Sequence, residues 1–279
     1  MENYTIHHEN CQLQIYTRGS VQSDIAVLFL HGGPGSGAAP IMELSAFQEL
    51  EKSYFCIYFD QRGSGLSTYD VEKGLPLSLI IEDVHQVILD IKSRYASKHL
   101  CLWGGSFGGC LAALYCERYP DTFDSLVLSS PALLFSRDQT IAFLKKMQKQ
   151  SAIHLPDLQG VLLQEECSPE ELFQLPTLRQ LVFSPHNPSK SLRHITAMSS
   201  WFFQQNFTEF LSQLQVPTLI LQGEEDPICS YENLSEGITK AQNPMICYHH
   251  YPSCGHEIFK SLPKIFVEVI QTFLEKEMK

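Results

Sequence analysis

Gly104-Gly105-Ser106-Phe107-Gly108 is the stretch of sequence that decides the fold. It matches the pattern G-x-S-x-G and lies between a strand-like segment, His99–Trp103, and a helix-like segment that begins near Phe107. A serine on such a sharp strand-to-helix turn has a strained backbone, and glycines two residues to either side avoid Cβ collisions. A passive serine in a glycine-rich turn is the competing interpretation. Strand, glycines and helix together favour Ser106 as a nucleophile.

Outward from this motif, strand-like runs alternate with helix-like segments. The expected strands are an N-terminal hairpin at Tyr4–His8 and Gln12–Thr17, and then Ile25–Leu30, Tyr54–Phe59, Phe123–Ser129, Pro217–Gln222 and Met245–Tyr251. The expected helices are Ile41–Glu51, Ser78–Tyr95, Leu111–Arg118 and a closing amphipathic helix at Lys264–Lys279. This alternation predicts an α/β fold with a mainly parallel central sheet and helices on both faces. Together with the G-x-S-x-G turn, it indicates the α/β-hydrolase fold.

The alternation of strand-like and helix-like segments stops after the sixth strand-like run. From Pro131 to about Asn206 the chain shows helical periodicity without strand-like runs, and Ser168-Pro169-Glu170-Glu171 is typical of a helix start. We therefore predict a core made of residues 1–130 and 206–279, with residues 131–205 forming a small helical cap. The cap is expected over the carboxyl edge of the sheet, where open α/β sheets bind ligands.

A serine nucleophile needs a base and a group that orients the base. In this fold the partners follow in the order serine, acid, histidine. Asp226 follows the Pro217–Gln222 run, and His256 follows the Met245–Tyr251 run, so both are expected at the carboxyl edge near Ser106. The sequence predicts His256 as general base and Asp226 as orienting acid, with Glu225 as the alternative acid.

Other histidines are weaker candidates. His249 and His250 lie within a strand-like run, where one packed and one exposed side chain are expected, and His85 lies on an amphipathic helix. Because no H-E-x-x-H arrangement occurs, no metal site is predicted. No cofactor is predicted either.

A second glycine-rich segment, His31-Gly32-Gly33-Pro34-Gly35, follows the Ile25–Leu30 run. Acyl transfer requires preorganised N–H donors for the developing oxyanion. The residue after the nucleophile, Phe107, supplies one such N–H, and Gly33 is the best candidate for the second. We therefore predict Gly33 and Phe107 as the oxyanion hole.

Composition limits the partners. The 279 residues carry a formal net charge of −11, which disfavours nucleic acids and anionic membranes as partners, so a small molecule or short peptide is the expected substrate. Several of the nine cysteines lie in apolar runs, no apolar run is long enough to span a membrane, and Met1-Glu2-Asn3-Tyr4 lacks a secretory pattern. These features predict a cytoplasmic protein, and they leave the oligomeric state open.

Three motifs together resemble the proline iminopeptidase family of α/β-hydrolases. They are His31-Gly32-Gly33-Pro34-Gly35, Asp60-Gln61-Arg62-Gly63-Ser64-Gly65-Leu66-Ser67 and Gly104-Gly105-Ser106-Phe107-Gly108-Gly109. The resemblance covers about residues 1–130 and 206–279. It implies the triad of Ser106, Asp226 and His256, and a bracing function for Asp60 and Arg62. It also implies cleavage of an N-terminal residue, often proline, with cap glutamates holding the free α-amine.

The sequence departs from the family pattern in two places. Phe107 stands where the family often has tryptophan, and the cap segment Trp201-Phe202-Phe203-Gln204-Gln205-Asn206 has glutamines where a glutamate is expected. Glu165, Glu166, Glu170 and Glu171 are cap carboxylates that could replace it, against the alternative of a solvated helix face. The predicted substrate-binding residues are Trp201, Phe202, Glu165 and Glu166.

The predicted function is that of a serine hydrolase, with an aminopeptidase or amidase of the proline iminopeptidase type first. A carboxylesterase or lactone hydrolase is the alternative within this class. A non-catalytic ligand-binding protein of the same fold, and a carbon–carbon bond hydrolase or serine-dependent lyase, are the rivals from other classes. A dehalogenase or epoxide hydrolase with an aspartate nucleophile is disfavoured because residue 106 is serine.

Overall fold

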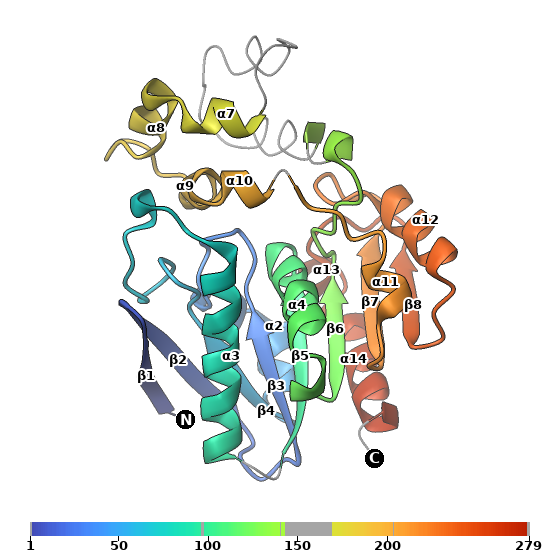
Figure 1. Ribbon diagram of the computed structural model, residues 1–279. Coiled ribbons are helices and arrows are strands. Elements are labelled where there is room, and N and C mark those ends of the chain that lie inside the picture. The colour runs from blue at the N-terminus through green and yellow to red at the C-terminus, as the bar shows by residue number, and fades with distance from the viewer. Residues whose placement is uncertain (1, 96–97, 140, 143–168, 203, 278–279) are drawn as a thin grey trace.

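One eight-stranded sheet organises the computed structural model, which describes residues 2–95, 98–139, 141–142, 169–202 and 204–277 (Figure 1). The strand order is β1-β2-β4-β3-β5-β6-β7-β8. β1 pairs antiparallel with β2, and β2 pairs antiparallel with β4, whereas every later neighbour pair is parallel. The strands are β1 (Glu2–His8), β2 (Cys11–Gly19), β3 (Ile25–Leu30), β4 (Phe55–Phe59), β5 (His99–Gly105), β6 (Ser125–Ser129), β7 (Thr218–Gly223) and β8 (Ile246–Tyr251).

Helices cover both faces of this sheet. In the core they are α1 (Ala39–Met42), α2 (Ser45–Leu50), α3 (Leu77–Arg94), α4 (Phe107–Arg118), α11 (Phe210–Gln213), α12 (Tyr231–Ala241), α13 (Ile258–Ser261) and α14 (Pro263–Glu277), with short 3-10 turns at Val71–Lys73 and Pro120–Thr122. The predicted α/β-hydrolase fold is confirmed.

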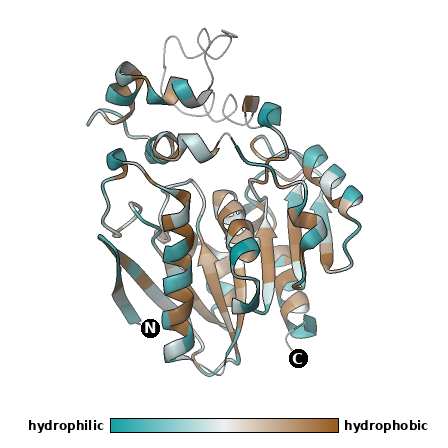
Figure 2. Cartoon of the chain, in the orientation of Figure 1, coloured by the Kyte–Doolittle hydropathy of each residue, from teal (hydrophilic) through white to brown (hydrophobic). Residues whose placement is uncertain are grey.

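The central parallel strands are almost continuously buried because both faces of the sheet are covered. Every residue of β4, β6 and β7 is buried. One face packs with α3 and α4, and the other packs with α2 and α14 around the fully buried Trp103 and Phe47. Figure 2 shows the apolar residues concentrated on the strands and the polar ones on the outer sides of the helices.

Four further helices lie over the carboxyl ends of the parallel strands (Figure 1). They are α7 (Pro169–Gln174), α8 (Pro176–Val182), α9 (Lys190–Ala197) and α10 (Ser199–Phe202). We call residues 169–202 the cap segment. They are helical as predicted, and Pro169 begins α7. The boundaries at residues 131 and 205 stay predictions.

One helix predicted as continuous is in fact broken. The segment expected as Ile41–Glu51 forms α1 and α2, because Leu44 between them has an extended backbone with φ −83° and ψ 136°. After this break α2 begins at Ser45, and its residues Phe47 and Leu50 are buried. Among the described residues, no helix combines the length and hydrophobicity needed to cross a membrane.

Candidate active site

The strand β5 ends at Gly105, and Ser106 is the cap residue from which α4 begins. Ser106 has φ 54° and ψ −122°, a conformation that costs a non-glycine residue about 1 to 3 kcal/mol. Its N–H donates to the Ser129 carbonyl at 3.0 Å, and its own carbonyl accepts from Gly109 N–H at 2.9 Å. The turn is therefore fixed on both sides by backbone hydrogen bonds.

The G-x-S-x-G spacing has a steric cause. A Cβ at Gly108 would collide with the Leu30 carbonyl, so only glycine lets α4 cross the end of β3 at this distance. The segment that follows β3 then runs beside Ser106: an added Cβ at Gly32 would lie 3.1 Å from the Ser106 Cβ and 3.7 Å from its Oγ. The two glycine-rich motifs, far apart in sequence, meet at Ser106.

His256 and Asp226 come from the loops after β8 and β7. His256 Nδ1 lies 2.8 Å from Asp226 Oδ2, and the carboxylate side chain is fully buried. The other carboxylate oxygen accepts backbone N–H groups from Ile228 at 2.8 Å and Cys229 at 3.0 Å. Glu225, the alternative acid, is exposed to solvent. The structure thus pairs His256 with Asp226.

Electrostatics keep this acid charged. Burial by itself raises the pKa of Asp226, but the hydrogen bonds from His256 and from the two backbone N–H groups outweigh it. The pKa of Asp226 therefore lies below its ordinary value, and the carboxylate is ionised at neutral pH. A charged carboxylate at Nδ1 fixes the tautomer of the ring and leaves Nε2 as the proton acceptor.

A cavity of about 370 Å³ joins these groups. Its lining includes Ser106, His256 and Gly33, so three of the five predicted catalytic and oxyanion residues meet in one space. Phe107 begins α4 beside them with its side chain buried. The rest of the lining is mainly apolar or hydroxyl-bearing: Ile41, Trp103, Ile228 and Phe259, with Ser36, Ser129 and Ser191.

Two of the predicted substrate-binding residues, Trp201 and Phe202, lie in the cap segment. Trp201 and Phe202 belong to α10, with ring centroids 6.1 Å apart, and neither lines the cavity with Ser106. Glu165 and Glu166 fall outside the described residues. The cap segment instead contributes Ser191 of α9, which sequence reasoning did not single out. Its only sequence signal is its position just after Ser189, the hydroxyl cap of α9.

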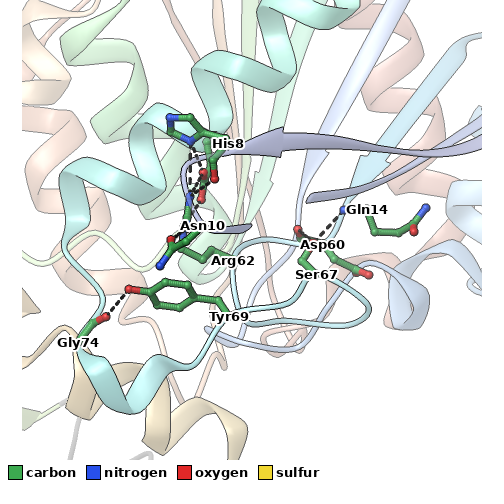
Figure 3. A network of polar contacts seen from close by, with 9 residues as sticks. His8, Asn10, Gln14, Asp60, Arg62, Ser67, Tyr69 and Gly74 are labelled. Carbon is green, nitrogen blue, oxygen red and sulfur yellow. Dashed lines mark hydrogen bonds and ion pairs between the residues drawn. The ribbon is translucent and has the colours of Figure 1, made fainter. Parts of the chain in front are cut away.

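Asp60 holds the loops beneath the site. Its buried carboxylate accepts the N–H of Ala38 at 2.7 Å, the N–H of Leu66 at 2.8 Å and the hydroxyl of Tyr16 at 2.8 Å. Ser67 Oγ donates to the Asp60 carbonyl at 2.6 Å (Figure 3). One side chain thus ties the segment after β3 to the segment after β4, as the resemblance implied.

Arg62 braces the same loop from below. Its guanidinium is fully buried and lies 2.6 Å from Asp83 Oδ1, which also lies 2.6 Å from His8 Nδ1. It donates to Asn10 Oδ1 at 3.0 Å and lies 5.0 Å from the centre of the Tyr69 ring (Figure 3). The network joins the β1–β2 turn to α3. Its place between these elements indicates a structural function.

One cluster has donor atoms of the kind that bind metals. The nearest donor atoms of Asp226, Cys229 and His256 lie within 4.8 Å of one another. The carboxylate and the imidazole already bond each other at 2.8 Å, so the arrangement is accounted for by the acid–histidine pair.

Comparison with known proteins gives one family and several distant relatives. The model of the family described as serine aminopeptidase, S33, matches residues 22–262. Human monoacylglycerol lipase ABHD6 is 26% identical over 96% of this chain and 81% of its own length. A proline iminopeptidase of Lactobacillus helveticus is 25% identical over 90% of each chain.

Among solved structures, a proline iminopeptidase-related protein of Thermus thermophilus superposes with a TM-score of 0.69 at 22% identity, over 99% of this chain and 98% of that one. At this identity the likeness shows the fold alone. The family model covers most of the sequence and includes the three motifs and the proposed acid and base. The chain therefore belongs to the serine aminopeptidase S33 family and has the α/β-hydrolase fold.

Proposed function

We propose that this hydrolase acts through an acyl-enzyme, with Ser106 as nucleophile, His256 as general base and Asp226 as the orienting acid. One observation carries the proposal. Ser106 has the strained backbone of a nucleophile turn and lines the same cavity as His256. Nδ1 of His256 is hydrogen-bonded to the buried Asp226, which leaves Nε2 for Ser106. A strained serine held beside a histidine–carboxylate pair is the arrangement that nucleophilic acyl transfer requires.

The steps follow from the geometry. Ser106 Oγ attacks the substrate carbonyl while His256 Nε2 takes its proton, and Asp226 stabilises the imidazolium that forms. The N–H groups of Gly33 and Phe107 hold the oxyanion, each contributing about 3 kcal/mol to the transition state. His256 then protonates the leaving group, and water attacks the acyl-enzyme with His256 again as base.

The family makes an aminopeptidase or amidase the first candidate for the substrate class. Such an enzyme needs a carboxylate for the free α-amine of its substrate. Among the described residues of the cavity, Glu257 is the one carboxylate, and it is already paired with Lys260 at 2.6 Å. If the enzyme is an aminopeptidase, Glu165 or Glu166 supplies the carboxylate that binds the α-amine. Otherwise Glu257 releases Lys260 and binds the α-amine itself.

A carboxylesterase is the second candidate, and the lining of the cavity favours it. Ile41, Trp103 and Phe259 offer apolar contact, three serines add uncharged hydroxyls, and the carboxylate of Glu257 is already paired with Lys260. A neutral ester fits this lining without an amine-binding group. Human monoacylglycerol lipase, similar over nearly the whole chain, is a relative whose name points the same way.

The nucleophile is tested by covalent labelling. We expect a fluorophosphonate probe to label the wild-type protein at one serine, and the Ser106→Ala variant to lose both labelling and turnover. Ser36→Ala is the matched control, since Ser36 lines the same cavity and should leave the labelling in place. Labelling that survives in Ser106→Ala would remove Ser106 as nucleophile. No labelling of the wild type would favour a non-catalytic binding protein.

The substrate class is tested by comparing kcat/KM for an L-prolyl arylamide and a short-chain aryl ester. Preference for the prolyl amide, lost when the α-amine is blocked, would establish the aminopeptidase. The Glu257→Gln variant and a Glu165→Gln/Glu166→Gln double variant then show which carboxylate binds the amine. Ester turnover without amide cleavage would establish the esterase.

A further inference from the structure

Two buried polar groups in the wall of the active-site cavity lack hydrogen-bond partners. They are Ser129 Oγ and Trp103 Nε1, and within the described part of the chain neither atom is paired. Both side chains are about 1% exposed, and both residues line the cavity that contains Ser106. An unpaired buried donor costs about 1 to 3 kcal/mol, so two beside a nucleophile call for a functional explanation.

The sheet places the two side chains on one of its faces. Trp103 of β5 pairs with Val127 of β6, and Gly105 pairs with Ser129 two positions further on. Because side chains alternate along a strand, Trp103 and Ser129 lie on the same face of neighbouring strands. The glycine at position 105 leaves the space between them uncovered by a side chain, and an added Cβ there would lie 2.6 Å from the indole ring.

The surroundings of these donors are apolar. The indole packs edge-on against Phe47 at 5.2 Å and lies 6.3 Å from Phe259 between ring centroids. Ile41 and Phe259 complete this part of the lining. A hydrogen bond formed in such a place is stronger than one in water, and it discriminates between ligands that can and cannot make it.

The chemistry of the donors limits what they can bind. An indole N–H donates only, and a serine hydroxyl can donate as well. A ligand atom bound by the indole N–H must therefore be an acceptor, such as a ketone, ester or ether oxygen, and the serine hydroxyl can donate to the same kind of atom. An ammonium group has only donors and cannot pair with the indole N–H, so the α-amine of a peptide would leave that donor unpaired.

We propose that Trp103 Nε1 and Ser129 Oγ form a subsite for a hydrogen-bond acceptor in the acyl part of the substrate. In the acyl-enzyme the acyl chain stays bonded to Ser106, whose N–H is itself bonded to the Ser129 carbonyl at 3.0 Å. The acyl chain is thus the part of the substrate held beside these donors. The preferred substrates are oxygen-bearing acyl esters or amides rather than plain hydrocarbon ones. This inference rests on the proposed function of Ser106.

The test compares matched aryl esters. The 4-oxopentanoyl and 5-oxohexanoyl esters are measured against 4-methylpentanoyl and 5-methylhexanoyl esters, which replace the ketone oxygen by a methyl group. After correction for their rates of alkaline hydrolysis, we expect wild-type kcat/KM to favour one oxo ester roughly tenfold, the value of one or two buried hydrogen bonds. Ser129→Ala and Trp103→Phe should each bring this ratio close to one.

Ser130→Ala is the matched control. Ser130 Oγ is also buried and unpaired, but Ser130 does not line the cavity, so its loss should leave the ratio unchanged. A wild-type ratio of one for both pairs, or a ratio preserved in both Ser129→Ala and Trp103→Phe, would overturn the subsite. Loss of hydrocarbon ester turnover in Ser106→Ala separates the two proposals, since it upholds the nucleophile whatever the ratio shows.

Discussion

Asp226 is held by more than its histidine. Gln222, the residue before the end of β7, is fully buried, and its Nε2 lies 3.1 Å from Asp226 Oδ2, the oxygen that also bonds His256. The same amide nitrogen donates to the carbonyls of Gly223 at 3.0 Å and Cys229 at 3.1 Å. Three acceptors around one nitrogen fix the orientation of the amide. Gln222 therefore holds the carboxylate through Oδ2, whereas the N–H groups of the loop hold Oδ1.

At the residue scale, we expect Gln222→Leu to lower kcat/KM roughly tenfold, the effect of one lost hydrogen bond to a charged group. With one donor fewer, Asp226 binds the imidazolium more strongly, so the acidic limb of the pH–rate profile should shift to higher pH. Tyr251→Phe serves as the control. It removes a buried polar group from the neighbouring strand β8, and this hydroxyl has no hydrogen-bond partner among the described residues. A Gln222→Leu profile that coincides with wild type would exclude a positioning function.

At the element scale, α9 connects the cap segment to the core through His194. The buried imidazole packs against Gly35, which has φ +88°. A Cβ added at Gly35 would lie only 2.5 Å from His194 Nδ1. Nε2 lies 3.4 Å from the Arg62 carbonyl, and the Leu75 N–H donates to the Ala197 carbonyl at 3.1 Å. One histidine of the cap thus packs against the loop after β3, at Gly35, and the loop after β4, at Arg62 and Gly63.

We expect His194→Ala to lower the free energy of unfolding by about 2 kcal/mol, because it empties a packed position. It should also lower kcat/KM, since α9 carries Ser191 into the cavity. Urea unfolding and ester turnover measure the two effects. His186→Ala is the control, because His186 is exposed on the preceding loop. If both variants behave alike, α9 is not anchored by His194.

At the scale of the whole molecule, His31 links stability to pH. It is fully buried, Nε2 accepts the Gln61 N–H at 3.1 Å, and Nδ1 lies 2.9 Å from the Gly32 carbonyl, so a neutral ring satisfies both contacts. Burial lowers the pKa of His31 from 6.5 to about 4. Between these values the unfolded chain binds a proton that the folded chain does not, so stability is lost as the pH falls.

We therefore expect His31 to account for a loss of about 3 kcal/mol in unfolding free energy as the pH falls from 7 to 4. Burial also lowers the pKa of His194, which adds a change of the same sign. Urea titrations at several pH values measure the slope. His31→Gln, which does not titrate, should flatten the slope even if it lowers stability overall. Equal slopes in the two proteins would refute the assignment.

Local patterns were enough to predict the fold. Apolar runs such as Ile25–Leu30 form buried strands at the predicted positions. A strand covered on both faces needs apolar residues at nearly every position, so it can be recognised from its composition. The turn at Ser106 could also be predicted from the sequence, because a strained turn between a strand and a helix requires glycines at fixed spacing. The break at Leu44 was missed because helical periodicity continues through it.

The sequence by itself determined the sheet, the order of Ser106, Asp226 and His256, and the family of the chain. These depend on local backbone constraints and on composition, which each segment carries in itself. Only the tertiary structure decided which further side chains belong to the site: Ser191, Trp103 and Ser129 line the cavity with Ser106, and Gln222 bonds Asp226. Their contacts join strands and helices distant in sequence, and strand register with helix packing decides which of them meet.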